Sequence, residues 1–196
     1  ITLVNPKVYI QQDRDGSWLN LNLNRKSGRE SISLDTTVRL RDADITAIPY
    51  TNSSPINIRV EGSGRYNPSN NKQVQYDLNA VIDRAKANIQ GETLIETGTT
   101  QAKVWVKDLV LGDLVPLIPN SSIEIGNGRL NTNLNVNIPS FAQINSTRID
   151  GLISLQGLKG KAKQLAQPFE ANSQLRFRQE KIGVEDTQAS IGDLVA

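Results

Sequence analysis

Closely spaced aspartates are the residues of this 196-residue chain that come nearest to a catalytic or metal-binding pattern. General acid–base chemistry needs two carboxylates that converge on one substrate, and a calcium loop needs further acidic ligands ending in a glutamate. The motif "DRDG" lacks those ligands, and the other pairs lie at the exits of predicted strands, where solvation or capping accounts for them. The pairs are Asp13 and Asp15, Asp42 and Asp44, and Asp108 and Asp113.

The side chains that most often carry nucleophilic or metal chemistry are missing. The chain contains no His and no Cys, which excludes a zinc site and a Cys- or His-dependent nucleophile. The glycine-containing stretches 62–67 and 126–129 precede no predicted helix, so neither forms a phosphate cradle. We therefore predict that the protein is not an enzyme and uses no cofactor or metal. A glycan-processing enzyme is the weakest alternative, because aromatic platforms for a sugar are limited to Trp18 and Trp105.

Charge and hydropathy argue against two further classes. Lys and Arg number 22 and Asp and Glu number 20, so the formal net charge is only +2, without a dense basic cluster. Nucleic acid is therefore not a predicted partner. An uninterrupted run of about 18 apolar residues, which a membrane-spanning helix needs, does not occur.

The elements that must hold any site are β-strands, because apolar and polar residues alternate through almost the whole chain. In "GRLNTNLNVNIPS" (128–140), aliphatic residues alternate with asparagines, so one face is aliphatic and the other carries amides. We predict an all-β chain of about ten to thirteen strands. They are expected within 18–24, 37–45, 56–66, 74–82, 87–96, 102–111, 128–140, 147–155, 173–179 and 187–192.

Two of these strands change the parity of their alternation partway along. The change falls between Leu40 and Ala43 in one strand, and between Val106 and Leu109 in the other. An extra residue at a β-bulge returns the apolar side chains to one face after such a change. Each of the two strands is therefore predicted to contain a bulge.

The segments 36–65 and 100–129 resemble each other. Each consists of a strand, a parity change, a Pro-containing apolar turn, an Asn-Ser-Ser loop and a strand that ends in Gly-Arg. A repeat of about 65 residues built from strands predicts stacked sheet units. We place the first unit or units at 1–99 and the second at 100–196.

The aliphatic face has two interpretations, an ordinary core covered by a second sheet or an open groove. Alternation does not separate them, since both need an apolar residue at every second position. Aromatic residues make up only 5% of the chain, which is few for a closed core, and no helix is predicted to cover the sheet. We therefore expect a long antiparallel or mixed sheet bent into a U-shaped groove. The predicted groove-lining residues are Val38, Leu40, Ile58, Val60, Tyr76, Leu78, Ile89, Ile95, Val104, Val106, Leu130, Leu134, Val136, Ile138, Ile149, Ile153, Leu155, Leu175 and Phe177.

The order of several short motifs resembles the AsmA/TamB superfamily, in the style of a cyanobacterial or chloroplast-type TamB homologue. The resemblance covers residues 100–196 well and 36–99 more faintly. "ASIGD" (189–193) is similar to the phrase with which these proteins end one repeat. The other matching stretches are "VWVKDLVLGDLVPLIPNSSIEIGNGRLNTNLNVNIPS", "IDGLISLQGL" and "FEANSQLRFRQEKIGVEDTQASIGD".

The resemblance implies a fold, a function and a location. TamB-like proteins are anchored in the inner membrane and cross the periplasm, or the chloroplast intermembrane space, as a bent sheet with a hydrophobic lumen, the β-taco. They are implicated in phospholipid transport between membranes and in outer-membrane protein assembly and translocation. Their C-terminal region meets an Omp85-family outer-membrane protein. We expect this chain to be a middle segment that binds phospholipid acyl chains, with the Omp85 contact made elsewhere in the full-length protein.

The alternative from a different class is a β-solenoid or sandwich module of a surface adhesin, whose aliphatic face is sealed as a core. A lipid conduit is expected to bind acyl ligand and a sealed module is not. In a sealed module a second sheet is also expected to lie on the aliphatic face.

Overall fold

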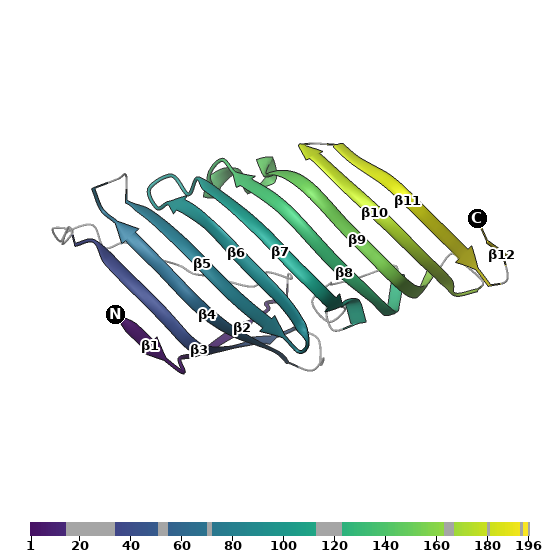
Figure 1. Cartoon of the computed structure of the whole chain (residues 1–196), viewed down its shortest axis with the longest axis horizontal. Coiled ribbons are helices and arrows are strands. Elements are labelled where there is room, and N and C mark those ends of the chain that lie inside the picture. Colours follow the sequence, from purple (N-terminus) through teal and green to yellow (C-terminus); the bar gives the residue numbers. More distant parts are fainter. Residues whose placement is uncertain are drawn as a thin grey trace.

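A computed structural model of the chain describes residues 1–14, 34–50, 55–69, 72–112, 123–162, 167–179, 181–192 and 194–195. These residues form one twelve-stranded sheet (Figure 1), so the all-β prediction is confirmed. A short 3₁₀ helix, η2 (Phe141–Ser146), joins two of the strands. The strands are β1 (Thr2–Val4), β2 (Lys7–Gln11), β3 (Thr36–Ile48), β4 (Ile56–Asn67), β5 (Gln73–Ile82), β6 (Ala85–Leu94), β7 (Thr100–Val110), β8 (Ile123–Ile138), β9 (Arg148–Ala162), β10 (Phe169–Gln179), β11 (Lys181–Ile191) and β12 (Leu194–Val195).

The sheet is mixed, as predicted, and it is open. From β3 to β12 each strand lies antiparallel to the next in chain order. β1 and β2 both run parallel to β3 along its other edge, beside residues 39–41 and 44–48 respectively. The two termini therefore lie at opposite ends of the sheet (Figure 1).

Strand β8 shows how the sequence pattern becomes a two-faced sheet. Leu134 pairs with Val104 of β7 and Gly151 of β9, whereas its neighbour Asn135 pairs with Lys103 and Asp150. Directly opposed residues on neighbouring strands point to the same side, and successive residues of a strand point to opposite sides. The alternation of one strand is thus copied across its neighbours as an apolar face and a polar face.

Both predicted bulges are confirmed. The pairing register shifts between Leu40 and Ala43 against β4, and between Val106 and Leu109 against β8. Asp42 and Asp108 lie inside these shifts with φ of 49° and 58°, a conformation that aspartate tolerates better than most residues. At the second bulge, the backbone N–H of Asp108 donates a hydrogen bond to Oδ1 of Asn131 at 2.9 Å.

The described residues do not enclose a large core. The buried hydrophobic side chains are mostly small or lie near the bulges, and no large side chain of the described residues is less than 2% exposed. The chain exposes 14007 Å², whereas a compact monomer of 21.5 kDa exposes about 9,200 Å². The buried hydrophobic residues are Ala43, Ala47, Ile56, Val60, Ala85, Leu109 and Leu111.

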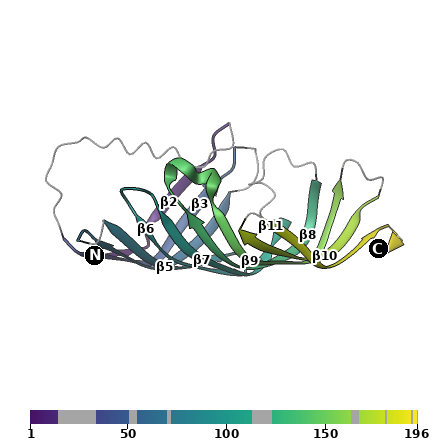
Figure 2. The same ribbon diagram turned by 90° about the horizontal axis from the view of Figure 1, so that it is seen from above.

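The strands form a single layer. Figure 2, turned by 90° from Figure 1, shows no second sheet against the first in the described part of the chain. The closed sandwich, considered above as an alternative, therefore does not hold for these residues. The strand expected within 18–24 lies outside the described residues.

Candidate functional site: an apolar sheet face

The apolar face is built from rows of opposed residues that cross the strands. Row A runs from β3 to β9, and rows B and C run from β3 to β11. All three rows consist of uncharged residues. Row A contains Val38, Gly64, Tyr76, Gly91, Ala102, Val136 and Ile149; row B contains Leu40, Gly62, Leu78, Ile89, Val104, Leu134, Gly151, Phe177 and Ile182; row C contains Ala43, Val60, Ala80, Ala87, Val106, Thr132, Ile153, Leu175 and Val184.

The remaining predicted lining residues fall on the same face, with one exception. Ile58 pairs with Ile45 and Ile82, Leu130 pairs with Leu109 and Leu155, and Ile138 pairs with Thr100. Ile95 is the exception, because β6 ends at Leu94 and Ile95 lies in the turn that follows. Strand pairing therefore does not assign Ile95 to a face, and its role as a lining residue stays a prediction.

Several residues on this face were not predicted as lining residues. The larger aliphatic ones are Ile45, Ile82, Leu109, Ile182 and Val184, each of which pairs with a predicted lining residue. Parity relative to the bulge in β3 or β7, or along β5 and the first half of β11, is the signal that identifies them.

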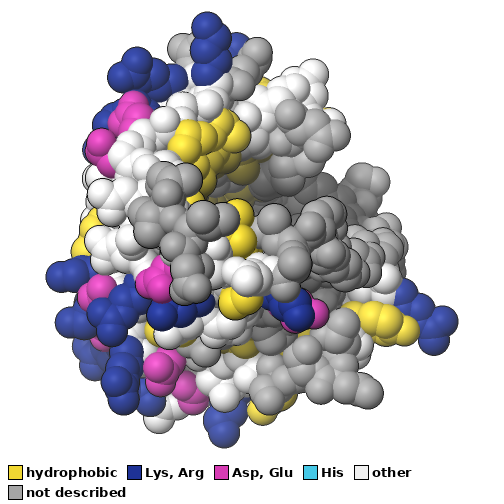
Figure 3. Space-filling model, turned by 90° about the vertical axis from the view of Figure 1, so that its right-hand side faces the viewer, with side chains coloured by type: hydrophobic (Ala, Val, Ile, Leu, Met, Phe, Trp, Pro, Cys, Tyr) yellow, Lys and Arg dark blue, Asp and Glu magenta, His cyan; other side chains and the backbone are white. Residues whose placement is uncertain are grey.

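The apolar face is only partly covered. Most of its side chains are half-buried, and at the far end of rows B and C Ile182 and Val184 are 62% and 65% exposed. Seen from that end, hydrophobic side chains gather near the middle of the molecule, while many Lys and Arg side chains stand along its outer margin (Figure 3). Among the described strands, none lies over these half-buried side chains as a second layer.

On the apolar face, aromatic rings lie over glycines of neighbouring strands. Tyr76 stands between Gly64 and Gly91 in row A, and a Cβ on Gly91 would lie 2.8 Å from the Tyr76 hydroxyl oxygen. At one end of β10, Phe169 takes the same place beside Gly160, with its Cζ 2.9 Å from the position of a Cβ. Rings that lie over neighbouring glycines in a sheet restore packing that glycine lacks.

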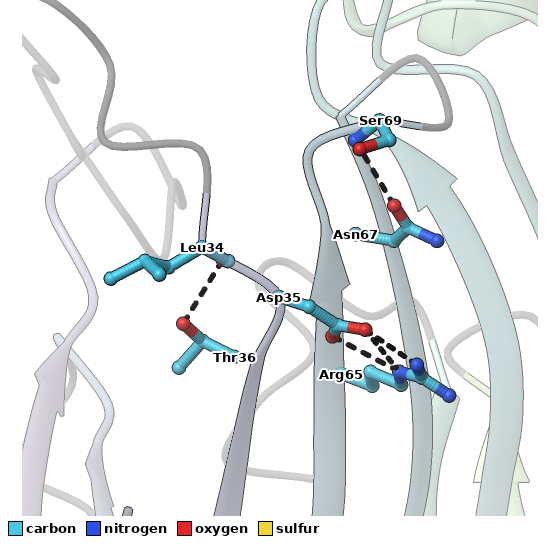
Figure 4. Close-up of polar contacts among 6 residues, drawn as sticks. All are labelled: Leu34, Asp35, Thr36, Arg65, Asn67 and Ser69. Carbon is cyan, nitrogen blue, oxygen red and sulfur yellow. Dashed lines mark hydrogen bonds and ion pairs between the residues drawn. The ribbon is translucent and has the colours of Figure 1, made fainter.

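The charged groups lie away from these rows. At the start of β3, Nε of Arg65 lies 3.1 and 3.2 Å from the two carboxylate oxygens of Asp35 (Figure 4). This hydrogen bond lowers the pKa of the exposed Asp35 carboxyl below its usual value and raises the pKa of Arg65. Exposed ion pairs of this kind contribute little to stability. We therefore interpret the pair as a surface contact between the start of β3 and the end of β4.

The paired aspartates do not assemble into a site. Asp42 and Asp108 occupy the bulges, and Asp44 lies on the polar face opposite Arg59. Among the described residues no group of three or more acidic, His or Cys side chains is placed to hold a metal ion. Asp15 and Asp113 lie outside the described residues.

Searches with the chain found no related protein. No protein-family model, no curated protein and no solved structure matches it. Within the described part of the chain there is also no helix with the length and hydrophobicity to cross a membrane. The resemblance to the AsmA/TamB superfamily therefore stays a prediction based on the quoted motifs.

Proposed function

We propose that the apolar face shelters the acyl chains of phospholipids. In this proposal the chain is a middle segment of a TamB-like, envelope-spanning protein that moves phospholipid between membranes and supports outer-membrane protein assembly. The observation that carries the proposal is the set of uncharged rows crossing an open, single-layer sheet.

The dimensions and chemistry of the rows suit an acyl chain. From β3 to β10 a row crosses seven strand spacings, about 34 Å, which exceeds half the thickness of a bilayer's hydrocarbon core, about 15 Å. Burying acyl carbons is favourable by about 0.8 kcal/mol per CH₂. Because rows A, B and C carry no charged side chain, a lipid tail meets few directional contacts and is free to move along the face.

Bending of this sheet into a U-shaped groove built from repeats is part of the same proposal. Two features support it. The bulge residues Asp42 and Asp108 stand at equivalent positions of the two similar segments. The outer edge of β11 is paired only at Ser190 and Ile191 among the described residues, which leaves backbone groups available for a further strand.

Acyl binding is tested by native mass spectrometry of the purified chain and by displacement of a fluorescent fatty acid. Leu134→Glu places a carboxylate in row B and is expected to weaken fatty-acid binding by tenfold or more, about 1.4 kcal/mol or greater, since an unpaired charge against acyl chains is costly. Asn135→Glu is the matched control, because it adds the same charge to the next residue on the polar face. Absence of bound lipid, or equal binding by the two variants, contradicts the proposal.

Transport is tested separately from binding. Val136→Arg in row A is expected to slow the transfer of fluorescent phospholipid between donor and acceptor vesicles, because a guanidinium interrupts the apolar path. Asn137→Arg, on the opposite face of the same strand, serves as its control. Transfer that is equally fast with both variants shows that row A does not lie on the route.

A further inference from the structure

The polar face carries three adjoining shallow hollows. One, with a volume of about 500 Å³, lies over β6, β7 and β8 and is lined by Gln90, Gln101 and Asn135 among others. A second, of about 250 Å³, lies beside it over β7, β8 and β9 and is lined by Trp105 and Leu152 among others. Both hollows lie on the face opposite the apolar rows, as the pairing of Gln90 with Lys103 and of Trp105 with Asn133 shows.

The hollows follow one another across the polar face. Lys103 and Asn135 line the first hollow, and the next polar-facing residues of the same strands, Trp105 and Asn133, line the second. The second shares Ser154 with a third hollow of about 490 Å³, which lies over β9, β10 and β11. We call this oblique path from β6 to β11 the Trp105 groove.

Trp105 stands in a mainly polar row that also contains Leu152 on β9. It lies between Asn88 and Asn133 on the neighbouring strands and is 41% exposed. Its ring is therefore not held there by burial in a core. An exposed indole offers a flat apolar surface together with an N–H donor, which suits a ligand that is apolar on one face and polar at its rim.

The amides around Trp105 have unused hydrogen-bonding capacity. Among the described residues, the side chains of Asn133, Asn135, Asn137 and Gln101 form no hydrogen bond with one another or with other groups. Each amide offers two donors and one acceptor. Together they match a ligand rich in hydroxyl or acetamido groups.

The charges along the groove nearly balance. Lys103 and Lys107 stand against Glu92, Asp150 and Asp186. A phosphate-rich or strongly acidic polymer needs an excess of Lys and Arg, which this path lacks. The ligand that fits is therefore uncharged.

We propose that the Trp105 groove binds a neutral, β-1,4-linked polysaccharide with equatorial substituents. Such a chain is extended and flat, so one sugar ring stacks its C–H face on the Trp105 indole while the neighbouring rings reach the amides of Asn135 and Asn137. The shallowness of the hollows suits a chain that lies along a surface. Because the groove and the apolar rows occupy opposite faces, this binding is independent of the lipid function.

Titration of the whole chain with chitohexaose and with cellohexaose, followed by calorimetry, tests the proposal. At least one hexasaccharide is expected to bind with a dissociation constant of about 1 mM or lower, near −4 kcal/mol, and Trp105→Ala is expected to weaken that binding about tenfold. Gln75→Ala is the matched control, because Gln75 is exposed on the polar face of β5 and lines none of the three hollows. It is expected to bind like the wild type.

The result that overturns the proposal is no binding of either hexasaccharide, or equal binding by Trp105→Ala and the wild type. Far-UV circular dichroism checks that Trp105→Ala keeps its strands. If it does not fold, Asn137→Ala takes its place, and undiminished binding by that variant overturns the proposal. Fatty-acid displacement is expected to be unchanged in all three variants, which separates failure of glycan binding from failure of the lipid function.

Discussion

Replacing Gly62 by alanine tests how closely β4 and β5 approach at row B. Gly62 has a φ of 149°, and a Cβ there would lie 2.9 Å from Cα of Leu78 and nearer still to the carbonyl oxygen of Asp77. Both atoms belong to the backbone of β5, so neither can rotate away. A non-glycine residue held in such a conformation costs about 1–3 kcal/mol, and displacement of β5 adds to that cost. We expect Gly62→Ala to lower the free energy of unfolding by about 2–4 kcal/mol.

Gly64 supplies the matched control on the same strand and the same face. The nearest atom to a Cβ on Gly64 is the carbonyl oxygen of Gln75 at 3.7 Å, an ordinary contact. Gly64→Ala is therefore expected to raise the free energy of unfolding by about 0.5–1 kcal/mol, because alanine loses less backbone entropy on folding. Urea denaturation followed by circular dichroism measures both variants. If Gly62→Ala is as stable as Gly64→Ala, the contact between β4 and β5 is looser than described and the reasoning is refuted.

The bulge in β7 and the ion pair near β3 give further predictions. At Asp108, whose φ is 58°, Asp108→Gly is expected to preserve stability while Asp108→Val costs about 1–2 kcal/mol; equal urea midpoints contradict this. Asn131→Ala removes the acceptor for the Asp108 amide and is expected to cost about 1 kcal/mol in the same assay, so an unchanged midpoint shows that water replaces it. Because Arg65 lowers the pKa of Asp35 in the folded state, this stabilisation is present above the unfolded pKa of about 3.9 and is lost as the pH falls through the folded value. The melting temperature of Asp35→Asn is therefore expected to fall less steeply than that of the wild type below about pH 4, and parallel curves argue against the pair.

Much of this structure could be predicted from the sequence because apolar and polar residues alternate along single strands. The period-two pattern in 128–140 predicts both the strand β8 and the face on which Leu134 lies. The parity changes before Ala43 and Leu109 predict the two bulges, because an apolar series that changes phase keeps one face only with an extra residue. A further bulge, where Asp186 has a φ of 44° opposite β10, separates Ile182 and Val184 from Ala189 and Ile191, which have the other parity. We did not predict this bulge, because the polar residues 185–188 separate the two short apolar series.

The alternation of apolar and polar residues does not predict which distant segments pair with each other. The parallel placement of β1 and β2 on one edge of β3 depends on contacts across more than thirty residues of chain, and no local pattern encodes it. The end of β6 before Ile95 depends on the turn that pairs Thr93 with Thr100. The position of Trp105 on the polar face follows from parity, but the hollows beside it depend on side chains that four neighbouring strands, β6 to β9, bring together.

The residues by themselves determined that the chain is all β, where most strands run and which side chains share a face, because these follow from interactions within one strand. Only the tertiary structure decided that the described strands join into one open mixed sheet with no second layer among them, and that the polar face is hollowed around an exposed tryptophan. These features depend on which strands become neighbours and on what covers them, and an alternating sequence satisfies a closed core and an open face equally well.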